Sequence, residues 1–169
     1  ESETGNLNPN VRAEVAVNPD SELIPVARSN GILLALTAPT GGILSGKSAV
    51  LQLDGWTWED LTVKSGVGMH IRWPLMAPVS DWWVEKSTKD QIQERDKQLE
   101  MLEETFKQGR LYMQSRQNPG HLTDLRLEAM IPVFERRQPI IVSANTISQI
   151  QAAVAFAVRH QVRLIIFGG

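Results

Sequence analysis

The feature that most constrains the fold is a strand, helix and strand pattern near the C-terminus. Residues 139–144 and 162–167 are apolar runs of strand length. Between them, Thr146 and Gln149 have the spacing of a capping box, in which each side chain bonds the backbone of the other. Apolar residues follow at helical spacing and predict the buried face of a helix: Ile150, Ala153, Val154, Ala157 and Val158. This pattern predicts a βαβ unit with parallel strands and a right-handed crossover.

A similar pattern is present near the N-terminus. Residues 15–17 are apolar, and Asp20 or Ser21 can cap a helix. Gly31 can end this helix in the left-handed conformation, and residues 32–36 have the composition of a strand. The predicted buried stripe of the helix contains Leu23, Ile24, Val26 and Ala27. The two patterns together predict an α/β fold built from parallel βαβ units.

The segment between these patterns, residues 38–84, is rich in glycine and proline. Thr57 is placed to start a helical turn, and residues 67–71 predict a strand that carries His70. Arg72 and Trp73 follow this strand directly, at the end that faces the active-site mouth in a β/α barrel. The five tryptophans, at positions 56, 58, 73, 82 and 83, all fall in this part of the chain. They predict either a small core under a long loop or, as the less favoured alternative, a platform for a ligand.

From residue 88 the pattern becomes helical. Thr88 and Gln91 have capping-box spacing, and apolar residues follow at positions 92, 99, 102, 106 and 113. We expect a helix of about six turns, frayed near Gly109, with an ion pair between Glu103 and Lys107. Its apolar face predicts that it covers the outside of a sheet, and partner binding is the alternative. A further helix is predicted over residues 122–136, kinked at a proline and with Leu127, Met130, Ile131 and Phe134 inward.

Composition excludes several classes of protein. A chain of 169 residues can form one domain that buries roughly 70% of its surface. A net charge of −2 does not favour a nucleic-acid binder. The absence of cysteine excludes disulfides and thiolate metal sites, and no apolar run is long enough to span a membrane. The compartment stays open, because a cytoplasmic protein and an exported protein with its signal removed would look alike.

One motif points to nucleotide chemistry. Gly41, Gly46, Lys47 and Ser48 match the phosphate-binding pattern G-x-x-x-x-G-K-S. In that mechanism a helix must begin directly after the lysine, so that its unpaired N–H groups and its dipole face the phosphates. Residues 50–54 instead alternate and lead into an Asp-Gly turn, which favours an extended chain. A small phosphotransferase, with Lys47 on the phosphates and Ser48 on magnesium, is therefore the second hypothesis.

Several stretches resemble bacterial metal-dependent amidohydrolases of the imidazolonepropionase-related kind. They are residues 17–20 (VNPD), 27–32 (ARSNGI), 39–46 (PTGGILSG), 53–56 (LDGW), 127–133 (LEAMIPV) and 139–144 (PIIVSA). The resemblance implies a TIM (β/α)8 barrel that is incomplete in this chain. Residues 1–169 would then form one partial barrel domain, with residues 85–118 as a long amphipathic helical insertion.

The resemblance also implies a divalent metal, zinc or similar, that activates water for hydrolysis. This chain has three separate histidines, His70, His121 and His160, and no His-x-His pair. Ser143 stands where many relatives carry a liganding histidine, and Gly68 where some carry a lysine. We therefore expect no metal ligand and no cofactor in this chain, and a metal only in an intact parent.

The leading hypothesis is a fragment of an amidohydrolase that acts on non-peptide or cyclic amide C–N bonds and is inactive alone. A non-catalytic barrel module that has lost its metal ligands is the third hypothesis. The expected partner is a small-molecule substrate of the parent, with no nucleic acid and no membrane, and a homo-oligomer stays open. The candidate substrate-binding residues are Lys47, Ser48, Arg72, Trp73, Ser143 and Asn145.

Overall fold

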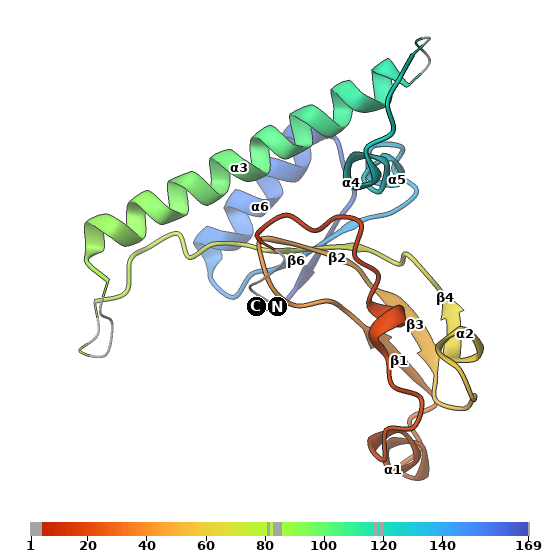
Figure 1. The fold of residues 1–169 in the computed structure, drawn as a ribbon. Coiled ribbons are helices and arrows are strands. Elements are labelled where there is room, and N and C mark those ends of the chain that lie inside the picture. The colour runs from red at the N-terminus through yellow and green to blue at the C-terminus, as the bar shows by residue number, and fades with distance from the viewer. Residues whose placement is uncertain (1–4, 81, 83–85, 117, 119, 169) are drawn as a thin grey trace.

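The computed structural model describes residues 5–80, 82, 86–116, 118 and 120–168. Two β-sheets organise these residues, one with four strands and one with three. The four-stranded sheet contains, in spatial order, β2 (Leu44–Lys47), β5 (Met69–Arg72), β6 (Ile140–Ser143) and β7 (Leu164–Phe167). The three-stranded sheet contains β1 (Leu34–Thr37), β3 (Ala49–Gln52) and β4 (Thr62–Lys64). Figure 1 shows the long helices α3 and α6 over the four-stranded sheet, and the three-stranded sheet in a separate lobe with the short helices α1 and α2.

The C-terminal βαβ prediction is confirmed. Strands β5, β6 and β7 are parallel, and α6 (Ile147–His160) connects β6 to β7. Thr146 and Gln149 form both bonds of the predicted capping box. The predicted buried face is partly wrong, because Val154 and Val158 are 43% and 71% exposed. The helix buries Ala153 and Ala157 as predicted. It also buries Gln149 and Phe156, which were not in the predicted stripe.

The N-terminal βαβ prediction is wrong. The expected first strand is replaced by η1 (Ala13–Ala16), a 3₁₀ helix. The helix α1 (Leu23–Ser29) has no buried residue, and β1 pairs antiparallel with β3 rather than parallel with a preceding strand. Gly31 does adopt a positive φ of 85° and ends the helix as expected. A seven-residue helix with Pro25 in its first turns has too little apolar surface to cover a sheet.

Helix α3 (Thr88–Ser115) is longer than predicted, with 28 residues and about eight turns. Its N-cap is Ser87, one residue before the predicted capping box, and the Ser87 hydroxyl accepts a hydrogen bond from the Asp90 N–H. The predicted fraying at Gly109 does not occur. A Cβ at Gly109 would stand 2.7 Å from the Phe134 ring, so the glycine permits close packing of α3 on α5.

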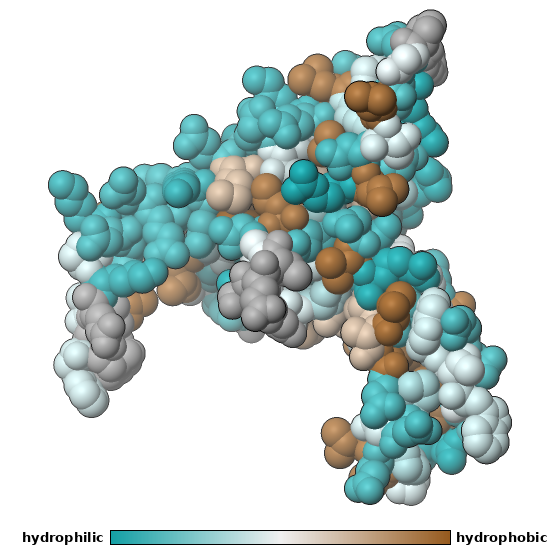
Figure 2. Space-filling model, in the orientation of Figure 1, coloured by the Kyte–Doolittle hydropathy of each residue, from teal (hydrophilic) through white to brown (hydrophobic). Residues whose placement is uncertain are grey.

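Helix α3 lies in the crossover from β5 to β6, and it packs on the sheet through the buried residues Leu102 and Phe106. This confirms that it covers a sheet, and Figure 2 shows its visible outer side as hydrophilic. The proposed insertion at residues 85–118 stays a prediction, since positions 85 and 117 lie outside the described residues. The predicted Glu103 to Lys107 pair is wrong, because Glu103 contacts Arg159 and His160 on α6 instead.

Two short helices replace the single helix predicted over residues 122–136. They are α4 (Leu125–Glu128) and α5 (Ile131–Phe134). Pro132 lies in the first turn of α5, where its missing N–H costs no helical hydrogen bond. Met130, Ile131 and Phe134 are buried as predicted, and Leu127 is partly buried against the same core.

The tryptophans do not form the small shared core that was predicted. Trp73 alone of the described tryptophans joins the main core, while Trp56 and Trp82 are 91% and 93% exposed. Thr57 does start a helical turn, α2 (Trp58–Leu61), through a complete capping box with Asp60. Trp83 lies outside the described residues.

The main core lies between the four-stranded sheet and the helices. Phe156 is at its centre, with ring centroids 4.8 Å from Phe106 and 5.5 Å from Trp73 in edge-to-face geometry. The helices cover one face of the sheet; on the other face Arg72 and Phe167 are exposed, whereas Ile141 is buried. Among the described residues, no helix has both the length and the apolar character needed to cross a membrane.

Candidate functional site

The C-terminal ends of the parallel strands bring polar side chains together. Arg72 on β5 and Ser143 on β6 are direct register partners. Alternate residues Ile71 and Val142 are buried against the helices. Because side chains alternate along a strand, Arg72 and Ser143 point to the opposite, helix-free face. Phe167 on β7 is the register partner of Ser143 and lies on that face too.

Trp73 occupies a different environment from Arg72, although it is the next residue. The residue is 4% exposed and its ring packs edge-to-face on Phe156, so it belongs to the core between sheet and helices. Its backbone N–H donates to the Ser143 carbonyl at 3.1 Å, which extends the pairing of β5 and β6. Trp73 therefore positions Arg72 and Ser143 rather than offering an open aromatic surface.

Asn145 lies where β6 passes into α6. Its backbone N–H donates to the Gln149 side-chain oxygen at 3.0 Å. Gly168, after β7, has a φ of 97°, and a Cβ there would stand 2.3 Å from the Asn145 amide oxygen. The Asn145 amide thus occupies the space that a side chain at position 168 would need.

Gln149 contributes more to this region than its capping role predicted. The side-chain N–H groups of this buried residue donate to the carbonyls of Trp73 at 3.0 Å and Pro74 at 3.2 Å. Gln149 therefore ties the exit of β5 to the start of α6. The capping box identified the residue from sequence, but its contacts lie about 75 positions away along the chain and have no local signal.

The structure places Lys47 and Ser48 at the other end of the sheet. Lys47 is the register partner of Met69, the first residue of β5, because β2 runs antiparallel to β5. Ser48 is buried, and its N–H donates to the Gly68 carbonyl. The six candidate residues therefore separate: Arg72, Ser143 and Asn145 lie at the strand ends, Trp73 lies in the core, and Lys47 and Ser48 lie at the opposite end of the sheet.

The phosphate-binding pattern lacks the helix that its mechanism requires. Lys47 ends one strand, and Ala49 begins the next, so the chain stays extended after the lysine as the alternation predicted. Gly46 has a φ of 128°, and a Cβ there would stand 2.7 Å from the Val11 carbonyl oxygen. This glycine serves a close backbone contact with the N-terminal segment.

A buried polar cluster surrounds Lys47, and sequence reasoning missed most of it. Glu14 is fully buried, and its Oε1 accepts hydrogen bonds from Arg12 Nε at 2.8 Å and Ser65 Oγ at 2.5 Å. Burial raises the pKa of Glu14, but the hydrogen bonds from Ser65, its own backbone and Arg12 outweigh burial and lower it below 4.5. The pKa of Lys47 is also lowered, chiefly by burial and then by the nearby Arg12 charge. The sequence signal for this cluster was the presence of Arg12 and Glu14 in the otherwise apolar stretch of residues 11–17.

The histidines are dispersed. His70 is half-buried on β5, burial lowers its pKa, and its Nε2 has no hydrogen-bond partner. His121 packs on Tyr112, and His160 contacts Glu103 at 2.7 Å. In the part of the chain that the structure describes, no three His, Cys, Asp or Glu side chains form a group able to hold a metal.

The strand ends do not fit the divalent metal that the amidohydrolase resemblance implies. The side chains there supply a guanidinium cation, a hydroxyl and an amide, from Arg72, Ser143 and Asn145. An adjacent fixed cation repels a metal ion, and neither a hydroxyl nor an amide replaces an imidazole as a zinc ligand. A lysine at position 68 would require Ile141 to move, since a Cβ there would stand 2.3 Å from the Ile141 side chain.

Comparison with known proteins identifies a shared fold. No protein-family model matches the sequence, and no curated protein matches it. The crystal structure of an amidohydrolase from Thermotoga maritima superposes with a TM-score of 0.80 over 98% of this chain, at 18% sequence identity. The chain spans 44% of the length of that amidohydrolase. At this identity the likeness shows the fold, a mixed α/β arrangement with parallel strands.

Proposed function

We propose that this chain is a segment of an amidohydrolase-type (β/α)8 barrel protein that hydrolyses non-peptide or cyclic amide C–N bonds. In this proposal the segment contributes part of the substrate pocket and is inactive alone. The observation that carries it is the set of polar side chains at the C-terminal ends of β5 and β6, within a fold shared with a solved amidohydrolase. Catalytic and binding groups of β/α barrels lie at these strand ends.

The chemistry of the strand-end residues suits recognition of a polar amide. Arg72 can donate to a carbonyl or carboxylate oxygen, and Ser143 can donate or accept beside it. Asn145 offers an amide that pairs with a substrate amide in both directions. Trp73 and Gln149 hold the backbone of these residues in place, as positioning residues.

The proposal assigns no chemical step to a metal bound by this segment. A divalent metal, zinc or similar, would have to be held by other residues of a longer parent, where it would activate water and polarise the carbonyl. Lys47 and Ser48 remain candidate substrate contacts from sequence alone. They lie at the opposite end of the sheet, which makes them less suitable than the strand-end residues.

The test is amide hydrolysis by a longer parent protein containing this segment. The parent should release ammonia, an amine or a ring-opened acid from at least one member of a panel of cyclic amides and N-acyl compounds. Residues 1–169 alone should give no turnover with the same panel. A parent that hydrolyses nothing in the panel and contains no metal by elemental analysis would contradict the proposal and favour a non-catalytic barrel module.

The residues at two expected ligand positions favour the non-catalytic module, the third hypothesis from the sequence. Ser143 and Gly68 stand at positions where the resemblance implies metal-binding groups, and the structure leaves no room for a larger residue at position 68 without moving Ile141. A non-catalytic module would still bind a small amide at the strand ends. Binding without turnover distinguishes the module from the enzyme.

A further inference from the structure

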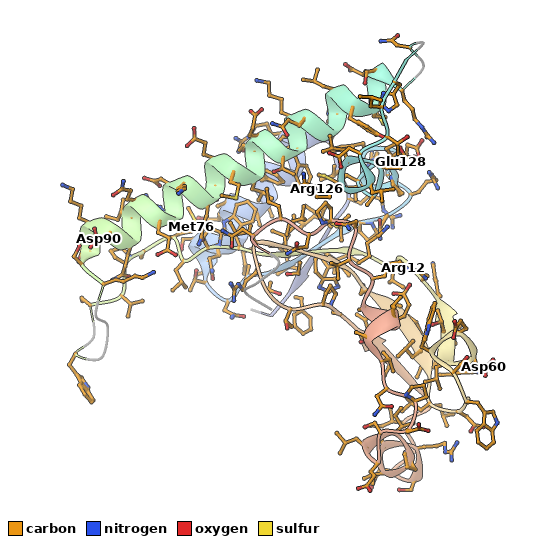
Figure 3. All side chains as sticks on the ribbon, viewed as in Figure 1. Arg12, Asp60, Met76, Asp90, Arg126 and Glu128 are labelled. Carbon is orange, nitrogen blue, oxygen red and sulfur yellow. The ribbon has the colours of Figure 1, made fainter. Side chains whose placement is uncertain are left out.

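A cleft lies where the N-terminal segment crosses between the two lobes, and none of its lining residues belongs to the proposed substrate-binding set. It has a volume of about 310 Å³, which is at the lower end of the range for small-molecule sites. One wall comes from residues between positions 8 and 17 and the other from residues 37–40, at the end of β1 and just after it, with Ser45 of β2 completing the lining. Figure 3 shows Arg12 at this crossing.

The cleft has one fixed positive charge and no carboxylate among its lining residues. Arg12 lines it, and Arg12 uses its Nε to bond the buried Glu14. Its two terminal nitrogens make no hydrogen bond with the described residues, and its guanidinium lies 5.6 Å from the Trp58 ring centroid. The Glu14 interaction and the Trp58 ring thus hold the guanidinium in place while leaving two donor groups for a ligand.

The three interacting charged groups Arg12, Glu14 and Lys47, of which Arg12 lines the cleft, carry a net positive charge. Glu14 offsets one positive charge, but Arg12 and Lys47 together supply two. The mutual effect of these cations is visible in Lys47, whose pKa is lowered by burial and then by Arg12. A bound anion would relieve this repulsion.

A buried hydroxyl also lines the cleft. Ser45 is 6% exposed, and its Oγ makes no hydrogen bond with any described residue. Its oxygen is not among the fully enclosed polar atoms, so it can be reached from the cleft. A buried hydroxyl usually has a partner, and a ligand oxygen would supply one. Val11, Ala16, Val17 and Pro39 provide apolar surface beside it.

We infer that this cleft binds a small aliphatic carboxylate, with its carboxylate on Arg12 and Ser45 and its short chain against the apolar wall. The single available cation suits a monoanion better than a phosphate, which prefers several donors. The apolar wall favours a molecule with a few carbon atoms over a bare inorganic ion.

Titration of the ¹⁵N-labelled 169-residue chain with sodium butyrate tests the inference. Amide shifts should move for residues 11–13, 37–38 and 45, with a dissociation constant on the order of 1–10 mM for so small a ligand. Butyramide has the same shape without charge and should bind about tenfold more weakly. Sodium chloride and inorganic phosphate serve as ionic controls, and both should bind more weakly than butyrate.

Arg12→Gln should weaken butyrate binding about tenfold or more. The matched control is Arg28→Gln, because Arg28 is equally exposed, at 45% against 46%, and also pairs with a carboxylate. Since Arg12→Gln also disturbs Glu14, Ser45→Val gives an independent test. It leaves Glu14 untouched and should abolish binding by removing the hydroxyl and filling the cleft.

Equal shifts with butyrate and butyramide would overturn the inference, as would equal affinities in the Arg12 and Arg28 variants. So would the absence of shifts at these residues up to about 50 mM butyrate. Tighter binding of phosphate than of butyrate would reject the carboxylate class. A folded Ser45→Val variant that binds butyrate as the parent chain does would reject the location.

Discussion

Some residues of this chain form hydrogen bonds with near neighbours in the sequence, and others with residues far away in the sequence. Thr146 and Gln149 were predicted as a capping box from three-residue spacing, and both bonds form. Arg12 and Glu14 were not predicted as a site, because Ser65, which also bonds Glu14, lies 51 positions away along the chain. Local hydrogen bonds have a sequence signature, whereas bonds across the chain depend on the fold.

Because of Glu14, the free energy of unfolding should decrease at acid pH. Its pKa in the folded chain lies below the ordinary value of 4.5, so its stabilisation is complete above about pH 4.5 and is lost as pH falls through the folded pKa. Urea unfolding at pH 7, 5, 4 and 3 should show this loss, and Glu14→Gln should flatten the dependence below pH 5. Glu22→Gln, at an exposed site, should not. An unchanged pH profile in Glu14→Gln would contradict the role of Glu14.

Gly109 tests whether packing or helix propensity decides stability. Gly109→Ala improves helix propensity by about 1 kcal/mol, but its methyl group would meet the Phe134 ring at 2.7 Å. We expect overpacking to exceed the gain and to lower the free energy of unfolding by about 1–2 kcal/mol. Chemical denaturation measures this, with Glu104→Ala on the exposed face as the control. A more stable Gly109→Ala chain would show that Phe134 moves aside easily.

At the scale of elements, prediction succeeded where helices are long and capped. The C-terminal βαβ unit has a complete capping box and two apolar strands, and it forms with the predicted elements and parallel pairing, although its helix buries a different face. The N-terminal unit failed because a short apolar run also fits a 3₁₀ turn, and a seven-residue helix carries little periodicity. Strand pairing of β1 with β3 depends on the intervening β2 joining the other sheet, which no local pattern encodes.

Gln149 connects two elements that the candidate site depends on. Gln149→Ala removes the side-chain oxygen that accepts from the Asn145 and Thr146 N–H groups, and leaves the carbonyls of Trp73 and Pro74 without this donor. We expect the free energy of unfolding to fall by about 2–3 kcal/mol. Gln151→Ala, on the exposed side of the same helix, should change it by less than about 0.5 kcal/mol. Similar losses in both variants would show that helix α6 responds generally and not through Gln149.

At the scale of the whole molecule, composition and two clear helical patterns predicted the α/β class. The arrangement of sheets and the grouping of site residues needed the structure. Arg72 and Ser143 become neighbours through parallel register, while the antiparallel direction of β2 moves Lys47 and Ser48 away. The sequence placed Arg72, Ser143 and Asn145 after apolar strands, and the structure brings Arg72 and Ser143 together, but the core position of Trp73 had no local signal.

Helix α6 exposes an apolar stripe. Ile147, Val154 and Val158, at helical spacing on one side of α6, are 76%, 43% and 71% exposed. We expect residues 1–169 to bind a hydrophobic dye and to self-associate at high concentration. Val158→Lys should reduce self-association in sedimentation velocity. Leu122→Lys, which changes an exposed leucine on a separate loop, should have little effect. Equal self-association of the two variants would show that this surface does not mediate the association.

The most direct test of the central claim is the kcat/KM for amide hydrolysis of a longer parent carrying Arg72→Ala. If the strand ends recognise the substrate, kcat/KM falls about tenfold or more. Arg126→Ala, which removes an exposed arginine on α4 with only a 3.9 Å ion contact, leaves kcat/KM unchanged. An Arg72→Ala parent with unaltered kcat/KM, while folded as judged by circular dichroism, would contradict the claim.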